Sequence, residues 1–236
     1  MVGGFVFYTK LLIITIGEIV GNEKKNQVSD NFIREYKNQF PDDFCDKLIN
    51  ILEENVKIGR THKGVSGKNK LNVHKKDSFD LDLIPDIGIE GVDIEVFREL
   101  YLYLYEPVIG YVNNYIVNSD GRKNYVSEKE GMATFILLQA PKLKVYRAPH
   151  QGFHAWHQDW GLLPVQARRL MAAMIYLNDV EEGGETAFFH QNIKVKPEKG
   201  KMVIFPPYFT HMHKGMRPIS NDKYICNCYF GVNPDI

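Results

Sequence analysis

Apolar residues in the first half of the chain recur at helical spacing in two places. In residues 42–55 the apolar positions follow the pattern i, i+4, i+7 and i+8, and acidic residues come directly after Pro41, so an amphipathic helix is predicted. Its apolar face consists of Phe44, Leu48, Ile51 and Leu52. Residues 93–117, rich in Leu and Tyr, predict a second helical region, which Pro107 should interrupt or start anew because proline lacks an amide donor. The polar stretch 61–79 between the two predicts a loop.

From residue 132 onward the pattern changes to short β-branched or aromatic runs, separated by glycine, proline and charged turns. Such runs predict strands, and they cover residues 132–139, 143–146, 170–177, 186–190, 202–205 and 224–230. Helices followed by strands indicate an α+β protein whose strands form a two-sheet jelly roll or a distorted barrel. We expect a single domain, in which residues 1–130 form an N-terminal helical support region packed on the major sheet and residues 131–236 form the strand core.

Composition argues against several kinds of partner. Lysine plus arginine and aspartate plus glutamate number 29 each, so the formal net charge is zero and no overall basic field favours nucleic acid or an anionic membrane. The three cysteines are an odd and sparse set, which fits a reducing cytosol, so we expect a cytoplasmic protein. The apolar run 11–16 is much shorter than a membrane span, and no cleavage pattern follows it. We expect neither a transmembrane helix nor a secretory signal; a strand is predicted there, with a poorly ordered leader as the alternative.

Two candidate metal ligands, His157 and Asp159, stand one residue apart in the segment 156–160. Residues i and i+2 of a strand point to the same face, so a His-x-Asp pair at a strand end directs an imidazole nitrogen and a carboxylate oxygen at one point. With a histidine as the third ligand, the set suits a non-haem Fe(II) ion that keeps open positions for oxygen activation. In a chain with eight histidines, however, such a pair also arises by chance.

The residues downstream of this pair make chance a poor explanation. A turn-rich segment at 181–186 and a strand-like run at 202–206 are followed by His213, and Lys223 stands ten positions after that histidine. Chance rarely supplies all of these features in one order. His211, two residues before His213, is the alternative third ligand.

In this order the features resemble the Fe(II)- and 2-oxoglutarate-dependent dioxygenases, most closely their prolyl 4-hydroxylase-like branch, over about residues 137–230. Residues 176–186 resemble the segment after the first metal motif of that family, and a lysine ten residues after the second histidine is typical of the branch. The resemblance therefore implies a double-stranded β-helix fold, and it selects His213 over His211. It implies Lys223 as the residue that holds the far carboxylate of 2-oxoglutarate. The Fe(II) ligands that it implies are His157, Asp159 and His213.

Further residues are implied around the cosubstrate. A carboxylate buried without a partner costs several kcal/mol, so a lysine that projects from a strand is a physical requirement at the far end of 2-oxoglutarate. In related enzymes a tyrosine on the strand before the metal motif bonds the same carboxylate, which implies this role for Tyr146, with Thr186 as a second candidate. Each of these two residues is equally explained as an ordinary sheet residue.

The activity that the resemblance implies is hydroxylation of an unactivated C–H bond, with O2 consumed, succinate and CO2 as coproducts, and ascorbate as a further candidate cofactor. A prolyl residue in a peptide or protein is the expected substrate; a free amino acid or another small molecule is the alternative. The residues by themselves leave two other classes open. A zinc-dependent or cupin-like hydrolase would use the same three ligands to activate water, and a non-catalytic β-sandwich would carry them as structural residues.

Overall fold

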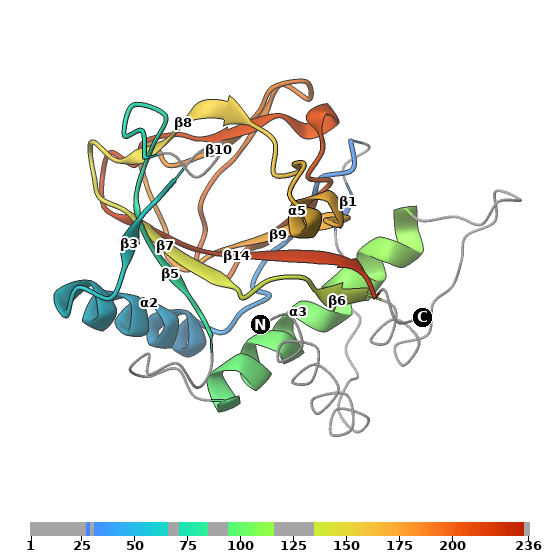
Figure 1. Ribbon diagram of the computed structural model, residues 1–236, viewed down its shortest axis with the longest axis horizontal. Helices are drawn as coiled ribbons and strands as arrows, with labels where there is room; N and C mark the ends of the chain where they lie inside the picture. Colours follow the sequence, from blue (N-terminus) through green and yellow to red (C-terminus); the bar gives the residue numbers. More distant parts are fainter. Residues whose placement is uncertain (1–26, 29–30, 66–70, 85–93, 116–134, 234–236) are drawn as a thin grey trace, which may run out of the picture.

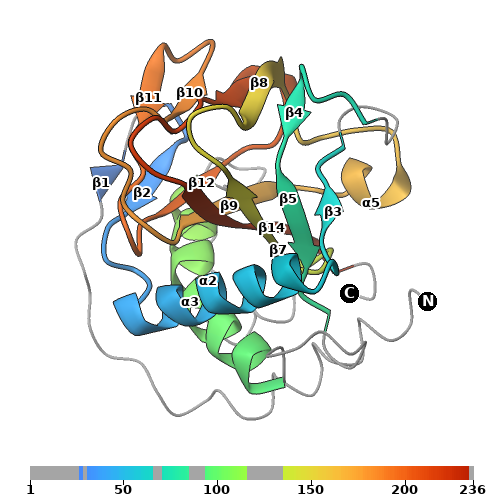
Figure 2. The same cartoon turned by 90° about the vertical axis from the view of Figure 1, so that its left-hand side faces the viewer.

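The computed structural model describes residues 27–28, 31–65, 71–84, 94–115 and 135–233 of the chain. In these residues two antiparallel sheets face each other, and two helices lie on the outer side of the larger sheet (Figure 1 and Figure 2). The larger sheet has nine strands within the described ranges. In spatial order they are β1 (Gln27–Val28), β2 (Arg34–Tyr36), β12 (Met202–Phe205), β9 (Met171–Tyr176), β14 (Lys223–Val232), β7 (Lys142–Tyr146), β5 (Phe79–Asp82) and β3 (His62–Lys63), with β6 (Phe135–Leu137) paired to β14.

The smaller sheet covers the inner face of the larger one. Its strands, again in spatial order, are β11 (Ile193–Val195), β10 (Thr186–Phe188), β13 (His213–Gly215), β8 (Gly152–His157) and β4 (Lys76–Asp77). Every pairing in both sheets is antiparallel among the described strands. This arrangement is consistent with the predicted jelly roll.

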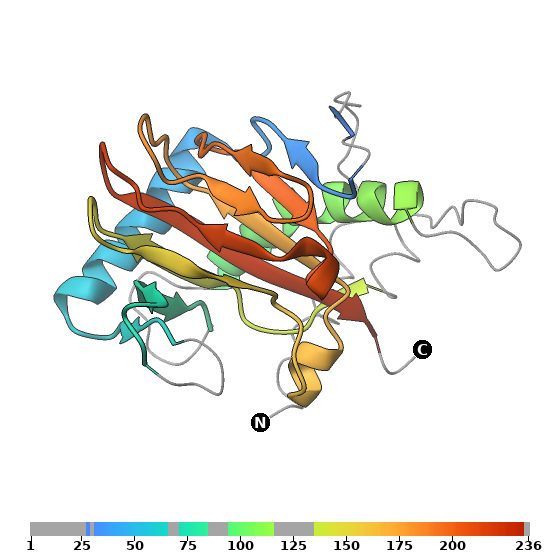
Figure 3. The ribbon, with the colours of Figure 1, turned by 90° about the horizontal axis from the view of Figure 1, so that it is seen from above.

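The first predicted helix is confirmed as α2 (Asp42–Lys57), and all four residues of its predicted apolar face are buried. Helix α2 contacts β5 and β7, and α3 (Ile94–Tyr115) contributes to the same hydrophobic cluster. Seen from above, both helices lie behind the strands of the larger sheet (Figure 3). The remaining short helices are α5 (Pro164–Ala167) and the 3₁₀ turn η1 (Phe209–His211).

Helix α3 runs without a break through Pro107, so the predicted interruption is wrong. Proline has no amide hydrogen, and a helix that contains it leaves the carbonyl four residues earlier without its usual donor. Here that carbonyl belongs to Tyr103, and the side chain of Gln39 donates to it at 2.9 Å. The Tyr36 hydroxyl donates to the Pro107 carbonyl, also at 2.9 Å. Side chains from the segment before α2 therefore replace the missing bond and fix the helix in place.

Strand β14 has two faces with different surroundings. Cys226, Cys228 and Phe230 point toward the helices and belong to the cluster that α2 and α3 complete. Ile225 and Tyr229 point the other way and belong to a second cluster, formed with residues of both sheets. Because side chains alternate along a strand, the larger sheet is covered on both faces, and its inner face lines the space that the smaller sheet closes.

All six strands predicted from the second half of the chain are present, as β6, β7, β9, β10, β12 and β14. Apart from residues 11–16, the sequence analysis predicted no strand in the first half, yet that half also supplies strands. Strand β2 pairs with β12, and β5 pairs with β7, so residues from the N-terminal part complete the larger sheet. Two short strands, β3 and β4, lie in the stretch 61–79 that was expected to be a loop.

Three further expectations concern the ends and the cysteines. The predicted strand at residues 11–16 lies outside the described residues. Among the helices that the structure describes, none combines the length and the apolar character needed to cross a bilayer. Cys45, Cys226 and Cys228 are buried free thiols.

Candidate metal centre

Strands β8 and β13 of the smaller sheet bring two histidines together. The strands pair antiparallel with His157 and His213 as direct partners, and the two ring centroids are 4.3 Å apart. Asp159 lies two residues after the end of β8, and its amide donates to the Pro207 carbonyl at 3.0 Å. This bond holds the segment after β8 against the segment after β12, so that the carboxylate faces both rings.

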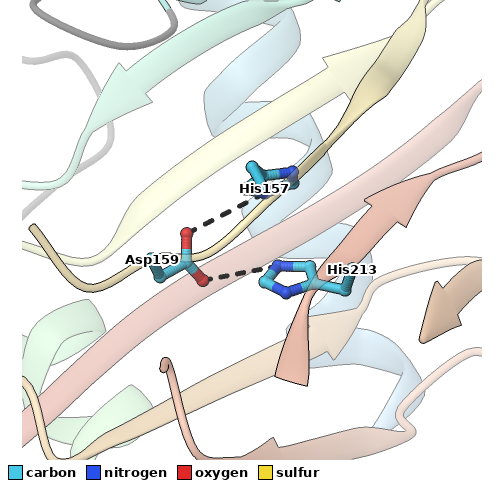
Figure 4. A group of neighbouring side chains, drawn as sticks. All are labelled: His157, Asp159 and His213. Atoms are coloured by element: carbon cyan, nitrogen blue, oxygen red, sulfur yellow. Dashed lines mark ion pairs between the residues drawn. The ribbon is translucent and has the colours of Figure 1, made fainter. Parts of the chain in front are cut away.

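The three predicted ligands therefore lie together (Figure 4). Asp159 Oδ1 is 4.0 Å from His157 Nε2, and Asp159 Oδ2 is 3.5 Å from His213 Nε2. One ligand atom from each residue lies within 4.8 Å of the others. Neighbouring ligands of an octahedral ion with bonds of about 2.1 Å are about 3 Å apart, so a small closure of these side chains would complete one face of such a site.

Hydrogen bonds fix which nitrogen of each ring faces the cluster. His157 Nδ1 donates to the Ala155 carbonyl at 3.0 Å, and His213 Nδ1 donates to the His211 carbonyl at 3.0 Å. A carbonyl oxygen only accepts, so each ring carries its proton on Nδ1 and presents the Nε2 lone pair toward Asp159. A bond of this kind from the second nitrogen is the usual way in which proteins orient a metal-binding histidine. The donor set thus fits a metal ion.

Burial and neighbouring charges set the protonation states of the cluster. Burial, followed by the His213 ring, lowers the pKa of His157 to about 3, against the opposing effect of Asp159. Burial disfavours ionisation of Asp159, but the two histidines and two further cations, Arg169 and Lys144, keep the pKa of that carboxyl below its usual value. Neutral imidazole and ionised carboxylate are the forms that bind a metal ion.

His211, the alternative third ligand, is engaged elsewhere. Its Nε2 donates to the Asn31 carbonyl at 2.9 Å, and its Nδ1 accepts from the Thr210 hydroxyl at 2.9 Å. Both ring nitrogens therefore have protein partners, while the His211 carbonyl orients the ring of His213. His213, and not His211, lies in the cluster with His157 and Asp159; its role as the third ligand stays a prediction.

Aromatic rings hold the two imidazoles. Phe153 stacks on His157 with ring centroids 3.5 Å apart. Phe205 and Phe188 flank His213 at centroid distances of 4.9 and 5.8 Å. Packing of this kind fixes the ring orientations and excludes water from the protein side of the centre.

Lys223 begins β14 and points into the same interior, with only 2% of its surface exposed. Its ammonium donates to the Gly184 carbonyl at 2.8 Å and lies 4.9 Å from the centroid of the Tyr146 ring, its direct cross-strand partner. Burial is the largest influence and lowers the pKa of Lys223 to about 7; Lys144 adds to this effect and Glu185 opposes it. A buried ammonium with a single carbonyl partner has donors left for a carboxylate.

The turn before β10 positions the carbonyl that Lys223 contacts. Gly183 and Gly184 both have positive φ angles, of 76° and 75°. A Cβ at Gly183 would lie 2.3 Å from the Arg217 carbonyl oxygen, so a side chain is excluded there by contact as well as by backbone conformation. Gly183 and Gly184, which the sequence predicted as a turn, therefore let the backbone lie close to the connection between β13 and β14.

Tyr146 and Thr186, the two further residues predicted for the cosubstrate, face the same interior. Thr186 lies opposite Gly215 of β13, and a Cβ built on Gly215 would be 3.5 Å from the Lys223 ammonium. The Thr186 hydroxyl accepts a hydrogen bond from Tyr176 at 2.7 Å. Burial raises the pKa of Tyr146, so its phenol keeps its proton. Their contact with a cosubstrate stays a prediction.

Sequence reasoning missed Arg169, which lies directly beside the centre. Its guanidinium donates to the Asp159 carbonyl and, through Nε at 3.0 Å, to the side chain of Gln139. It also stacks 3.7 Å from the centroid of the Tyr229 ring. An arginine directly before an apolar strand is ordinarily a solvated strand start, so the sequence carried no signal for this position.

Two antiparallel sheets with two histidines and one carboxylate converging between them are typical of proteins that bind a non-haem ferrous ion. In the sequence comparison, residues 142–231 match the family model of the 2OG-Fe(II) oxygenase superfamily. That segment contains His157, Asp159, His213 and Lys223, and it is similar to this superfamily.

One curated relative is a protein of Acanthamoeba polyphaga mimivirus named "Putative prolyl 4-hydroxylase". It is 32% identical over 71 residues, which are 27% of this chain and 29% of the relative. The match therefore spans less than a third of the relative's length.

Solved structures of prolyl hydroxylases share the fold. The enzyme from Trichoplax adhaerens, in complex with a peptide fragment of the hypoxia inducible factor oxygen degradation domain, has a TM-score of 0.64 at 13% identity, covering 98% of this chain and 93% of its own. The viral collagen prolyl hydroxylase of Paramecium Bursaria Chlorella virus-1, in its 2OG complex, has a TM-score of 0.55 at 20% identity, covering 84% and 95%. A Pseudomonas putida prolyl-4-hydroxylase has a TM-score of 0.58 at 14% identity, covering 94% and 98%. At these identities the likeness concerns the fold alone.

Proposed function

We propose that the protein is an Fe(II)- and 2-oxoglutarate-dependent dioxygenase that hydroxylates an unactivated C–H bond of a prolyl residue in a peptide or protein. The observation that carries this proposal is the convergence of two histidines and one aspartate on the smaller sheet, across from a buried lysine on β14. The two sheets would form a double-stranded β-helix, with the helices of residues 1–130 supporting the larger sheet and residues 131–236 carrying the site.

Each residue of the cluster has a defined task in this proposal. His157 and His213 would bind Fe(II) through Nε2 and Asp159 through one carboxylate oxygen, leaving the remaining positions of an octahedral ion open. When bound, the ferrous ion and 2-oxoglutarate supply the oxidation of the C–H bond by O2, with succinate and CO2 as coproducts. The bonds from Nδ1 to the Ala155 and His211 carbonyls keep both rings in the ligating orientation.

Lys223 would bind the far carboxylate of 2-oxoglutarate. One ammonium proton already meets the Gly184 carbonyl, and two remain for the carboxylate. The Tyr146 ring beneath the ammonium holds its position, and its protonated phenol is a further donor to the same group. Thr186, held by Tyr176, is the third residue proposed to line this end.

A prolyl substrate is supported by the names of similar proteins. The mimivirus relative is named a prolyl 4-hydroxylase, and the structural neighbours are prolyl hydroxylases, one of them in complex with a peptide fragment. Proline side chains offer only C–H bonds, which is the kind of bond that an oxygen-activating centre of this type is suited to hydroxylate.

The proposal is tested by measuring succinate formed from 2-oxoglutarate with Fe(II), with and without ascorbate, and with and without a panel of proline-rich peptides. We expect slow uncoupled turnover without peptide and faster turnover with at least one peptide class, whose mass rises by one oxygen atom. His157→Ala, purified in parallel, serves as the matched inactive protein.

The small-molecule and hydrolase alternatives give different results in the same assay. If a free amino acid stimulates turnover and no peptide does, the proposed peptide substrate is wrong, whereas the proposed 2-oxoglutarate-dependent hydroxylation stands. If no succinate forms, and the protein with Zn(II) instead cleaves a substrate without consuming O2, the dioxygenase proposal is wrong.

A further inference from the structure

A second buried ionic cluster lies beside the candidate metal centre. The Lys76 ammonium is 2.6 Å from Asp80 Oδ2, and the Ser78 hydroxyl donates to Asp80 Oδ1 at 2.6 Å. All three residues are buried. Each oxygen of the Asp80 carboxylate therefore has one close partner, Lys76 or Ser78, in the protein interior. Lys76 comes from the smaller sheet and Asp80 from the larger one, so their ion pair also links the two sheets at one edge.

Lys144 of β7 faces this cluster without a hydrogen-bonded partner of its own. It is the cross-strand neighbour of Asp80 and lies on the same side of β7 as Tyr146, the inner side of the larger sheet. Only 6% of its surface is exposed. Among the residues that the structure describes, no acceptor lies within hydrogen-bonding distance of its ammonium. Burial is the largest influence on this group and lowers the pKa of Lys144 to about 7.

Lys144 lies near both the predicted cosubstrate anchor and the predicted metal ligands. On the adjacent strand its direct partner is Ile225, two residues from Lys223. Its charge also acts on the pKa of Lys223 and on that of Asp159. A cation at this place can therefore act on a charged group that binds in the site.

The charges of the interior do not balance. Lys76, Lys144, Lys223 and Arg169 are the cations, while the facing carboxylates are Asp80, Asp159 and Glu185, which acts on Lys223. A ferrous ion and the 2-oxoglutarate dianion cancel each other, so their binding would leave the surplus positive charge unchanged. Buried charge without a partner is costly, which favours an additional anion next to Lys144.

One more polar group at this place lacks a partner. The side-chain oxygen of Asn227 is buried and has no hydrogen bond within the described part of the chain. Asn227 lies on β14 two residues beyond Ile225, the partner of Lys144. A cation without an acceptor and an amide oxygen without a donor therefore lie on neighbouring strands, on the face that carries the site.

We propose that Lys144 binds a carboxylate of the substrate, so that the prolyl residue which is hydroxylated carries an acidic group next to its ring. This inference rests on the proposed function and specifies its substrate class. In a peptide or protein this carboxylate has two sources, a C-terminal proline or an acidic residue directly after the proline; free L-proline is the small-molecule alternative. Asp80 acts on Lys144 through its charge but accepts no hydrogen bond from it; its two oxygens accept from Lys76 and Ser78.

The test compares acidic probes with neutral partners of the same shape. The pairs are L-proline and L-prolinamide, an acetylated Ala-Ala-Pro peptide as acid and as amide, and acetylated Ala-Pro-Glu-Ala amide with its Gln counterpart. KM for each probe and its succinate yield are measured with Fe(II) and 2-oxoglutarate. In the wild-type protein we expect one acidic member to have a KM lower by about tenfold to a hundredfold, and the pair that shows this identifies the source.

Variants of Lys144 isolate its contribution. Lys144→Met should remove the difference between acid and amide, and Lys144→Arg should retain most of it. Lys142→Gln is the matched control, because Lys142 lies on the same strand, pairs with Asp82 at 3.1 Å at the surface, and should leave the discrimination intact. Replacing a buried cation by an apolar side chain is commonly neutral or stabilising, so the Met variant should melt no lower than wild type.

A second measurement does not depend on turnover. The melting temperature of the metal-free protein should rise on adding the preferred acidic probe, and this rise should be lost in Lys144→Met. If 2-oxoglutarate is turned over with equal KM for every acid and amide pair, the inference is overturned and the proposed function stands. A Lys144→Met effect confined to the KM for the cosubstrate overturns it as well, because the lysine would then belong to the 2-oxoglutarate site. Absence of any 2-oxoglutarate turnover contradicts the proposed function itself.

Discussion

The two faces of the larger sheet differ in what they bury. On the outer face, Cys226, Cys228 and Phe230 of β14 pack with the helices in a cluster of apolar side chains. On the inner face, the same strand carries Lys223, and the neighbouring β7 carries Lys144, both almost fully buried. Alternate residues of one strand thus contribute to a hydrophobic core and to a charged site.

This difference shows how the fold divides stability from chemistry. Apolar burial on the outer face is favourable in proportion to the area removed from water, whereas buried ammonium groups on the inner face oppose folding until they meet an anion. The helices α2 and α3 stabilise the sheet from one side, so the other side can hold groups that are unfavourable without their ligands. Substitutions on the two faces should therefore have opposite consequences.

The largest effect is expected at the predicted metal ligands, which the smaller sheet carries opposite the inner face of the larger sheet. His157→Ala and Asp159→Ala should each lower 2-oxoglutarate turnover by on the order of a thousandfold or more, because loss of one of three ligands weakens both metal affinity and geometry. Succinate formation and Fe(II) binding are the measurements. His211→Gln is the control, since that ring bonds Asn31 and Thr210 outside the cluster. Substantial turnover by either alanine variant would contradict the ligand assignment.

A pair of substitutions on β14 sharpens the contrast between the faces. Lys223→Ala should raise the KM for the cosubstrate 2-oxoglutarate on the order of 100-fold, because the far carboxylate loses its cation, without lowering the free energy of unfolding. Phe230→Ala should instead lower the free energy of unfolding by about 3–5 kcal/mol and leave the KM of the folded protein unchanged. Urea unfolding and steady-state kinetics measure both quantities. An equal loss of stability in the two variants would break the comparison.

The pH dependence of cosubstrate binding gives a smaller, graded effect. Burial lowers the pKa of Lys223 to about 7 in the free protein, and a bound carboxylate favours the ammonium form and raises that pKa. The affinity for 2-oxoglutarate should therefore be complete below pH 7 and fall above it, by up to about tenfold per pH unit. Calorimetric titration from pH 6 to 9 measures this, and Lys223→Arg should flatten the curve. Lys144 titrates in the same range, so Lys144→Met is measured alongside.

The smallest effect is expected in the helical layer. Gln39→Ala removes the donor that serves the Tyr103 carbonyl below Pro107, and it should lower the free energy of unfolding by about 1 kcal/mol. In a Pro107→Ala background the backbone amide of residue 107 can donate to the Tyr103 carbonyl. Gln39→Ala should then lower the free energy of unfolding by less. Urea unfolding of the four proteins of this double-mutant cycle measures the difference. Equal losses in both backgrounds would show that Gln39 acts elsewhere.

The sequence by itself determined the amphipathic helix at α2 and all six strands predicted in the second half. It also singled out His157, Asp159 and His213, which lie close together in the structure, while their role as metal ligands stays a prediction. These features are local or follow from order and spacing. Periodicity shows which face of a helix is buried, and a His-x-Asp pair on a strand directs both ligands to one side.

Only the tertiary structure decided which contacts are made between distant segments. Helix α3 continues through Pro107 because Gln39, from another segment, replaces the missing donor. Residues 142–146 alternate between polar and apolar side chains, the pattern of a strand with one solvated face, yet Lys144 is buried against Asp80 because a second sheet covers that face. Alternation specifies that a strand has two unlike faces; what covers the polar one depends on chain segments far away in the sequence.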